Sequence, residues 1–186
     1  ESDTLDLSKT KMDPGHVLLL SWWLTTEFSA AVARLILDEN PLTGGRRPTN
    51  FDTDITGITA LCDTLKTSSV TELGLAKCRL GPGSMGKLAK YVRDAKAAMN
   101  SLTLDMNSIF GEFWPSGNVK EADKFAGECD AFFAALKGSN IVTLSLQKTG
   151  IGPVTLRKLA TSLPAAVNAV TVDGNPIGFP SSTTLK

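Results

Sequence analysis

The sequence predicts an α/β fold made of stacked strand–turn–helix units, and two observations support this. First, a template of the form apolar-x-apolar-x-x-(Asn, Cys or Thr)-x-apolar matches the 186-residue chain six times. Second, several copies are followed by a turn of Gly and Pro and then by apolar residues at helical spacing. One such unit cannot bury its apolar side alone, so the units must stack on one another.

The strands come first in each unit. Their first apolar positions are Leu5, Leu35, Leu73, Leu102, Leu144 and Val170, and the polar turn positions are Thr10, Asn40, Cys78, Asn107, Thr149 and Asn175. The two apolar residues of each strand should point inward, with the residue between them pointing outward. The Asn, Cys or Thr side chain can hydrogen-bond backbone groups that the turn would otherwise bury unpaired. Cys78 is therefore interpreted as a turn residue.

The helices follow the turns, and the first differs from the others. It is expected over residues 14–26, with Val17, Leu20 and Leu24 in the core. The positions expected to face outward are polar or mixed in the later helices, where they include Tyr91, but in the first they are Leu18, Leu19, Trp22 and Trp23. An exposed apolar patch of this size usually marks a contact. Either a missing cap or preceding repeat covers it, or it contacts a partner or a second copy.

Two units carry insertions between strand and helix. Residues 43–56 contain Arg46, Arg47 and Phe51, and residues 110–123 contain Phe113 and Trp114. Both insertions leave from the same corner, two repeats apart, so their bases should lie within about 10 Å of each other. They are expected to form one continuous rim, which either covers the core or binds a partner.

The six-fold pattern resembles leucine-rich-repeat proteins. A helix in each repeat and a period of roughly 28 residues are most similar to the ribonuclease-inhibitor-like class. The resemblance covers essentially the whole chain and implies one domain, residues 1–186. Its fold would be a solenoid, or horseshoe, with about six parallel strands on the concave side and about five helices on the convex side. The first repeat begins without room for a terminal cap, as expected of a fragment of a longer chain.

The resemblance also implies a recognition surface, because the concave face of stacked repeats is the usual one. The residues expected there are mixed in charge and slightly acidic. The candidates for binding are Asp6, Lys9, Ile36, Asp38, Glu39, Asp105, Met106, Gln147, Lys148 and Asp173.

Composition and chemistry argue against several function classes. Nineteen basic and 19 acidic residues give no electrostatic case for nucleic acid or an anionic membrane, and no apolar run is long enough for membrane insertion. Three cysteines without metal-ligand spacing favour a reducing compartment, hence a cytoplasmic location. The single histidine, His16, has no partner motif for catalysis. We expect no enzyme activity, metal or cofactor, and interpret Gly81-x-Gly83-x-x-Gly86 as a repeat turn rather than a dinucleotide site.

The sequence thus predicts a non-catalytic protein-interaction module that displays a rigid surface to a partner of unknown identity. One alternative is a structural subunit, or a dimer, docked through the apolar face of the first helix. Another is a GTPase-regulating or actin-binding domain, since similar folds occur in Ran GTPase-activating proteins and tropomodulins. In that case Arg46 or Arg47 could act as an arginine finger.

Overall fold

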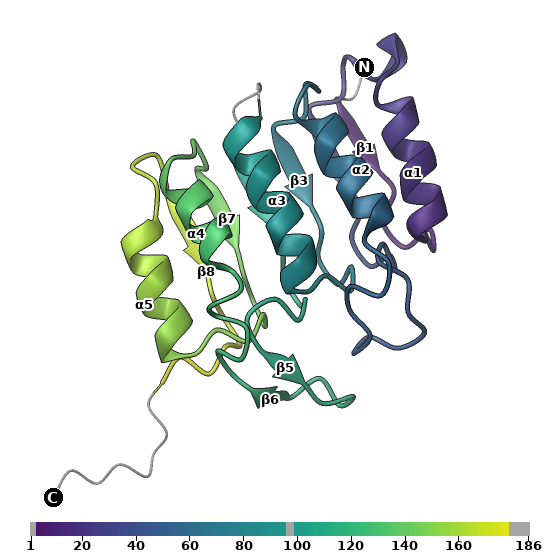
Figure 1. Ribbon diagram of the computed structural model, residues 1–186. Coiled ribbons are helices and arrows are strands. Elements are labelled where there is room, and N and C mark those ends of the chain that lie inside the picture. Colours follow the sequence, from purple (N-terminus) through teal and green to yellow (C-terminus); the bar gives the residue numbers. More distant parts are fainter. Residues whose placement is uncertain (1–2, 96–98, 179–186) are drawn as a thin grey trace, which may run out of the picture.

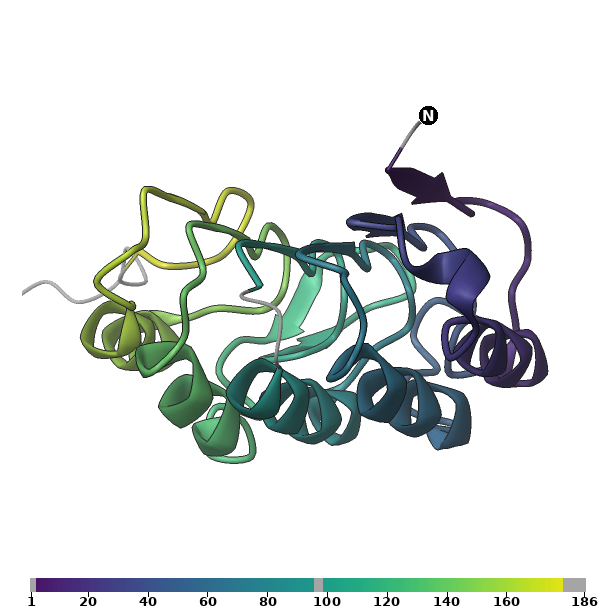
Figure 2. The ribbon, with the colours of Figure 1, turned by 90° about the horizontal axis from the view of Figure 1, so that it is seen from above.

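A computed structural model of the chain describes residues 3–95 and 99–178, and these form two layers (Figures 1 and 2). One layer is a six-stranded parallel sheet with strand order β1-β2-β3-β4-β7-β8. The other consists of five α-helices on one face of that sheet. The strands are β1 (Thr4–Asp6), β2 (Arg34–Ile36), β3 (Glu72–Gly74), β4 (Ser101–Thr103), β7 (Thr143–Ser145) and β8 (Ala169–Thr171).

The register of the sheet confirms the six strands that the template predicts. The first apolar positions of all six copies pair in one row across the sheet, from Leu5 opposite Leu35 to Leu144 opposite Val170. Their side chains enter the space between sheet and helices, and the four from Leu35 to Leu144 are almost completely buried. The repeat in the sequence is therefore a repeat in space.

Each helix returns the chain to the start of the next strand. The helices are α1 (Pro14–Trp23), α2 (Thr56–Leu65), α3 (Pro82–Asp94), α4 (Asp130–Lys137) and α5 (Pro153–Ser162), and a short 3-10 helix, η1 (Glu27–Ser29), follows α1. Val17, Leu20 and Leu24 of the first repeat lie in the core, as predicted. Among the described residues, no helix has the length and apolar character needed to cross a membrane.

Hydrogen bonds from the polar turn residues join successive repeats. The Asn107 side chain accepts bonds from the backbone N–H groups of Cys78 and Leu80, both at 3.0 Å, and donates to Leu75 O at 2.8 Å. The Cys78 thiol donates to Leu37 O at 3.2 Å. Asn40 and Asn175 make equivalent bonds to the turns before theirs. The predicted turn function of these residues, Cys78 included, is confirmed.

One expectation about the later helices was wrong, and the second insertion has a structure that the sequence did not indicate. Tyr91 does not face outward but is fully buried, because α3 lies between α2 and α4 and both of its flanks are covered. The second insertion is not a plain loop. It contains an antiparallel hairpin of β5 (Glu112–Phe113) and β6 (Val119–Glu121), which forms a second, two-stranded sheet.

Candidate functional site

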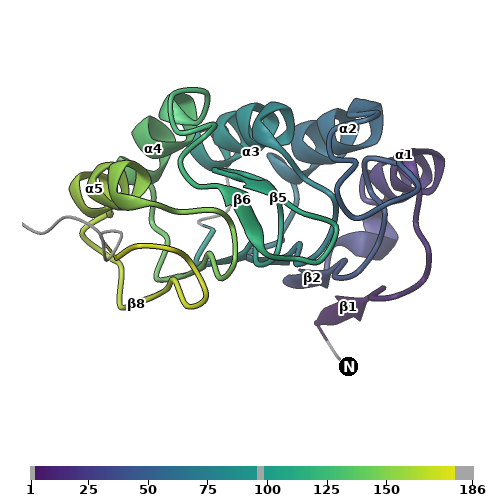
Figure 3. The same cartoon turned by 90° about the horizontal axis from the view of Figure 1, so that it is seen from below.

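The two insertions meet at the edge of the molecule where the parallel strands end and the helices begin (Figures 1 and 3). The rings of Phe51 in the first insertion and Phe125, just after the second, are in edge contact with centroids 5.6 Å apart. The predicted proximity of the insertions is confirmed.

Asp52 of the first insertion caps the helix of the following repeat. Helix α3 begins after Gly81, which has no side chain to serve as a cap. The Asp52 carboxylate instead accepts hydrogen bonds from the backbone N–H groups of Gly81 at 2.9 Å, Gly83 at 2.7 Å and Ser84 at 3.2 Å, and from the Ser84 hydroxyl. Four donors at this helix start are thus satisfied by a residue of the previous repeat.

Asp123, at the end of the second insertion, does the same for α5. Its carboxylate accepts bonds from the backbone N–H groups of Gly152 at 2.9 Å, Val154 at 2.8 Å and Thr155 at 2.9 Å. Burial alone would raise the pKa of Asp123, but hydrogen bonds from Thr155, Val154 and Gly152 to the charged form outweigh it, so the pKa lies below its ordinary value. Asp52 and Asp123 both have left-handed backbone, with φ of 52° and 60°, which Asp tolerates better than most residues.

These caps explain the glycines at the helix starts. A Cβ on Gly81 would lie 2.3 Å from the Phe51 ring and 2.7 Å from Asp52, and one on Gly152 would lie 2.4 Å from Asp123. The N–H groups that a phosphate would need at the Gly81-x-Gly83-x-x-Gly86 segment already donate to Asp52. The segment is a repeat turn with a close-fitting carboxylate.

The hairpin β5–β6 is held firmly over the turn after β7. Gly111 and Gly150 touch through their backbones, since a Cβ on Gly150 would lie 2.4 Å from Gly111 N. Glu112 on β5 forms ion pairs with Lys120 at 2.9 Å and with Lys124. The hairpin lies beyond the ends of the parallel strands (Figure 1). Trp114, next to its tip, is half exposed.

A cleft of about 440 Å³ lies between the hairpin tip, the first insertion and the turns that follow four strands. Its volume is in the range of pockets that hold ligands. One wall comes from the hairpin tip and another from Pro48 and Thr49 of the first insertion. The turns that follow β2, β3, β4 and β7 contribute Glu39, Lys77, Arg79, Met106, Ser108 and Lys148.

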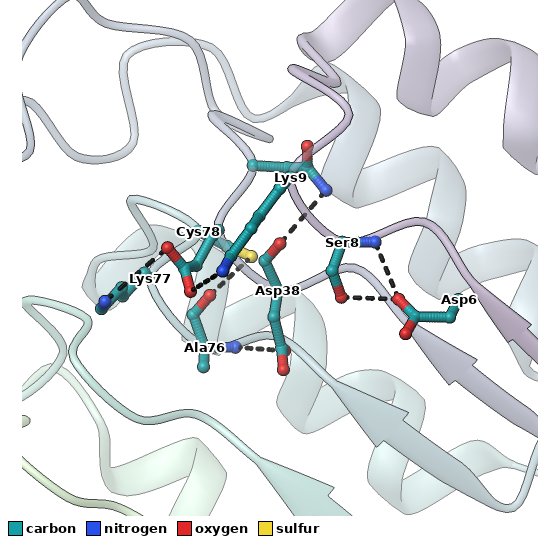
Figure 4. Close-up of polar contacts among 9 residues, drawn as sticks. Asp6, Ser8, Lys9, Asp38, Ala76, Lys77 and Cys78 are labelled. Atoms are coloured by element: carbon teal, nitrogen blue, oxygen red, sulfur yellow. Dashed lines mark hydrogen bonds and ion pairs between the residues drawn. The ribbon is translucent and has the colours of Figure 1, made fainter.

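The floor of the cleft is formed by part of a row of turn residues, one after each strand, that crosses the sheet. Lys9, Glu39, Lys77, Met106 and Lys148 occupy equivalent places and all have left-handed backbone. Glu39 pairs with Lys9 at 3.5 Å and with Lys77 at 3.7 Å, in the region drawn in Figure 4. The Lys148 side chain is exposed and has no ion-pair partner within the described part of the chain.

Arg79 also lines the cleft, but unlike the lysines of the floor it is bonded to the first insertion. Its guanidinium donates to the carbonyl oxygens of Gly44, at 3.2 Å, and Gly45. It therefore holds the first insertion in place while adding positive charge to the cleft.

The open face of the sheet, away from the helices, is acidic. Asp38 accepts a bond from Ala76 N at 2.8 Å, and Asp6 accepts bonds from the Ser8 backbone and hydroxyl (Figure 4). Asp105 accepts a bond from Gln147 N at 2.9 Å. Burial and the neighbouring charges of Asp6, Asp105 and Glu39 raise the pKa of Asp38. This face has a hollow of only about 80 Å³, which Ile36 and Asp38 help to line.

The other predicted binding residues lie in several places. Of the residues expected on the concave face, Glu39, Met106 and Lys148 line the cleft, whereas Asp173 is exposed near the last strand. Of the predicted rim, Phe113 and Trp114 line the cleft, and Phe51 packs on Phe125. Arg46 and Arg47 are exposed on the first insertion outside the cleft lining. Sequence analysis missed Lys77 and Arg79, although Lys77 occupies the same place in its repeat as Glu39 and Met106.

The outer face of α1 is apolar, as predicted, with one exception. Leu18, Leu19 and Trp22 are 45%, 63% and 64% exposed, but Trp23 is half-buried against the core. Phe28 in η1, which the periodicity did not indicate, is 78% exposed and extends the exposed apolar surface to the next element. His16 joins Asp13 in a capping box at the start of this helix.

No protein-family model matches the sequence, and no curated protein matches it either.

Proposed function

We propose that the chain is a leucine-rich-repeat solenoid of the ribonuclease-inhibitor-like class that acts as a non-catalytic protein-interaction module. The in-register parallel strands, the helices on one face and the Asn ladder between turns support the class. The binding site is the cleft at the strand ends. Its support is a single observation: residues of the strand turns and of both insertions, which are far apart in sequence, line one hollow.

Rigidity supports a binding role for this cleft. The first insertion is fixed by Arg79 and Asp52, and the hairpin by Gly150 and Asp123. A preformed site loses little ordering entropy when it binds. Half-exposed Trp114 provides an aromatic anchor of the kind that dominates protein interfaces.

Selection from a random displayed-peptide library tests this proposal. Peptides enriched on the wild-type protein should lose affinity for the Trp114→Ala variant and keep it for Trp22→Ala. The second variant is a matched control, because Trp22 is also exposed but lies on α1. Failure to enrich any peptide, or equal affinity for both variants, would contradict the proposal.

A second candidate function is docking into a larger assembly through α1 and η1. The observation in its favour is the exposed apolar surface of Leu18, Leu19, Trp22 and Phe28. Sedimentation of wild type and Leu19→Ser/Trp22→Ser variants, with Trp114→Ser as control, tests it. Self-association that only the α1 variant loses supports docking, and a monomer in all three argues against it.

A further inference from the structure

The charge of the cleft differs from that of its surroundings. Three basic residues, Lys77, Arg79 and Lys148, and one acidic residue, Glu39, line it. The chain as a whole has no net charge, and the adjoining open face of the sheet is acidic. Positive charge is therefore concentrated at the strand ends, where it complements a small number of carboxylates.

Apolar residues lie among these charges. Met106, on the turn after β4, lies between Lys77 on the turn after β3 and Lys148 on the turn after β7. Met106 is 44% exposed and Trp114, on the wall, 52% exposed. Lys120 Nζ lies 5.0 Å from the centroid of the Trp114 ring, a cation–π contact within the hairpin.

The sheet sets the spacing of the turns that carry the two lysines. The Lys77 side chain leans toward Glu39 and the Lys148 side chain toward Gly174, but both are exposed and their flexible stems can turn toward a ligand. Neighbouring strands are about 4.8 Å apart, so the turns that carry Lys77 and Lys148, two strands apart, are separated by about 10 Å. Side chains three residues apart in an extended polyproline-II chain are separated by about 9 Å. A peptide that crosses the strand ends can thus bring its first and fourth side chains over the two lysine turns. Its backbone then passes over Met106, and one of the two intervening side chains is directed toward Trp114 on the wall.

We propose that the cleft binds an extended peptide segment of the form acidic-apolar-apolar-acidic. This rests on the proposed interaction function and names the chemistry of the partner segment. One carboxylate pairs with Lys148, and the other replaces Glu39 as the partner of Lys77, which pairs with Glu39 at 3.7 Å in the free protein. The apolar residues between them lie over Met106 and beside Trp114. A nucleic acid strand fits less well, because its continuous phosphate charge would meet Glu39 in the cleft and the acidic face beside it.

The proposal can be tested by the fluorescence of Trp114 in a variant that has no other tryptophan. In a Trp22→Phe/Trp23→Phe background, with folding checked by circular dichroism, Trp114 is the only tryptophan. The probe is a capped peptide Ser-Glu-Leu-Leu-Glu-Ser. Its controls are Ser-Leu-Glu-Glu-Leu-Ser, which has the same composition with altered spacing, Ser-Lys-Leu-Leu-Lys-Ser, and an oligothymidylate.

The expected result is saturable binding of the first peptide, tighter than that of either peptide control and weakened by added NaCl. Lys148→Glu should weaken it about tenfold or more, because it replaces attraction by repulsion. Lys90→Glu, the same charge change at an exposed site on α3, should leave it unchanged.

Three outcomes would overturn the proposal: no binding, equal binding of the altered-spacing or lysine peptide, or tighter binding of the oligothymidylate. The selection from a displayed-peptide library, described above, distinguishes failure of this proposal from failure of the proposed interaction function. If other peptides depend on Trp114, the cleft binds proteins with different chemistry. If none does, both proposals fail.

Discussion

Single carboxylates determine how two helices of this protein begin. Helices α3 and α5 start with Gly-Pro and have no capping side chain of their own, yet each N-terminus is bonded to an aspartate about thirty residues earlier in the chain. Such a bond ties three elements together: an insertion, a helix and the turn before that helix. Loss of this bond should therefore destabilise the insertion and the turn as well as the helix terminus.

Asp123→Ala should lower the free energy of unfolding by about 1 to 2 kcal/mol, the usual loss when a helix cap is removed. Because the folded-state pKa lies below the ordinary value of 3.8, the stabilisation is present above that value and disappears as pH falls through the folded pKa. Urea denaturation of wild type and variant at pH 7 and pH 3 measures both effects. The difference in free energy of unfolding between wild type and variant should be smaller at pH 3 than at pH 7.

Glu128→Ala is the control, since Glu128 is exposed and near Asp123 in sequence. It should change stability by less than about 0.5 kcal/mol. An Asp123→Ala variant as stable as wild type at pH 7 would show that the three N–H groups find water instead.

At the scale of elements, the fit between the first insertion and α3 depends on the missing side chain of Gly81. In Gly81→Ala the new Cβ would collide with Phe51 and Asp52, so the insertion must move away. We expect faster trypsin cleavage after Arg46, which is exposed, whereas the bond after Arg47 precedes proline and resists trypsin.

The matched control is Gly86→Ala, on the same helix. A Cβ there meets nothing within 4 Å, and alanine favours helix over glycine. Limited proteolysis followed by mass spectrometry compares the two variants. Equal cleavage rates would mean that the insertion tolerates the collision without leaving the helix.

The elements also show what the sequence could and could not predict. Strands and core helix positions followed from periodicity, because Leu5, Leu35 and their counterparts depend on local pattern alone. The caps by Asp52 and Asp123 depend on contacts between distant segments and have no local pattern. The available signal was indirect: two helices began with Gly-Pro, and an insertion containing aspartate preceded each.

Other features escaped prediction for similar reasons. The hairpin β5–β6 lacks alternation of apolar and polar residues and owes its place to Gly111, Gly150 and ion pairs. Tyr91 is buried because a helix in the middle of the layer has neighbours on both sides, whereas the periodicity describes only the side toward the sheet. The cleft was not predicted, because the turn residues and the insertion residues that line it were assigned to two separate surfaces.

At the scale of the molecule, one hydrophobic core runs from α1 to α5 and contains all three cysteines. Burial raises the pKa of Cys62 and of Cys129 to about 12, and that of Cys78 also lies above its ordinary value. The folded protein should not react with iodoacetamide at pH 8. Labelling in increasing urea should modify all three thiols in one transition, as peptide mass spectrometry can measure. Earlier modification of Cys129 would show that the repeats unfold separately.

The caps supplied by Asp52 and Asp123 have a consequence for how a chain of this kind can change its length. Deleting β2 with its insertion and helix removes the carboxylate that α3 needs. Deleting β2 through α3 together removes both the capping aspartate and the helix that it caps, and the same holds for β4 through α5. A repeat that supplies such an aspartate cannot be excised alone, and a repeat that receives one cannot be duplicated alone, without leaving a helix that lacks its cap. A pair of repeats, one supplying and one receiving the cap, can be excised or duplicated as a unit.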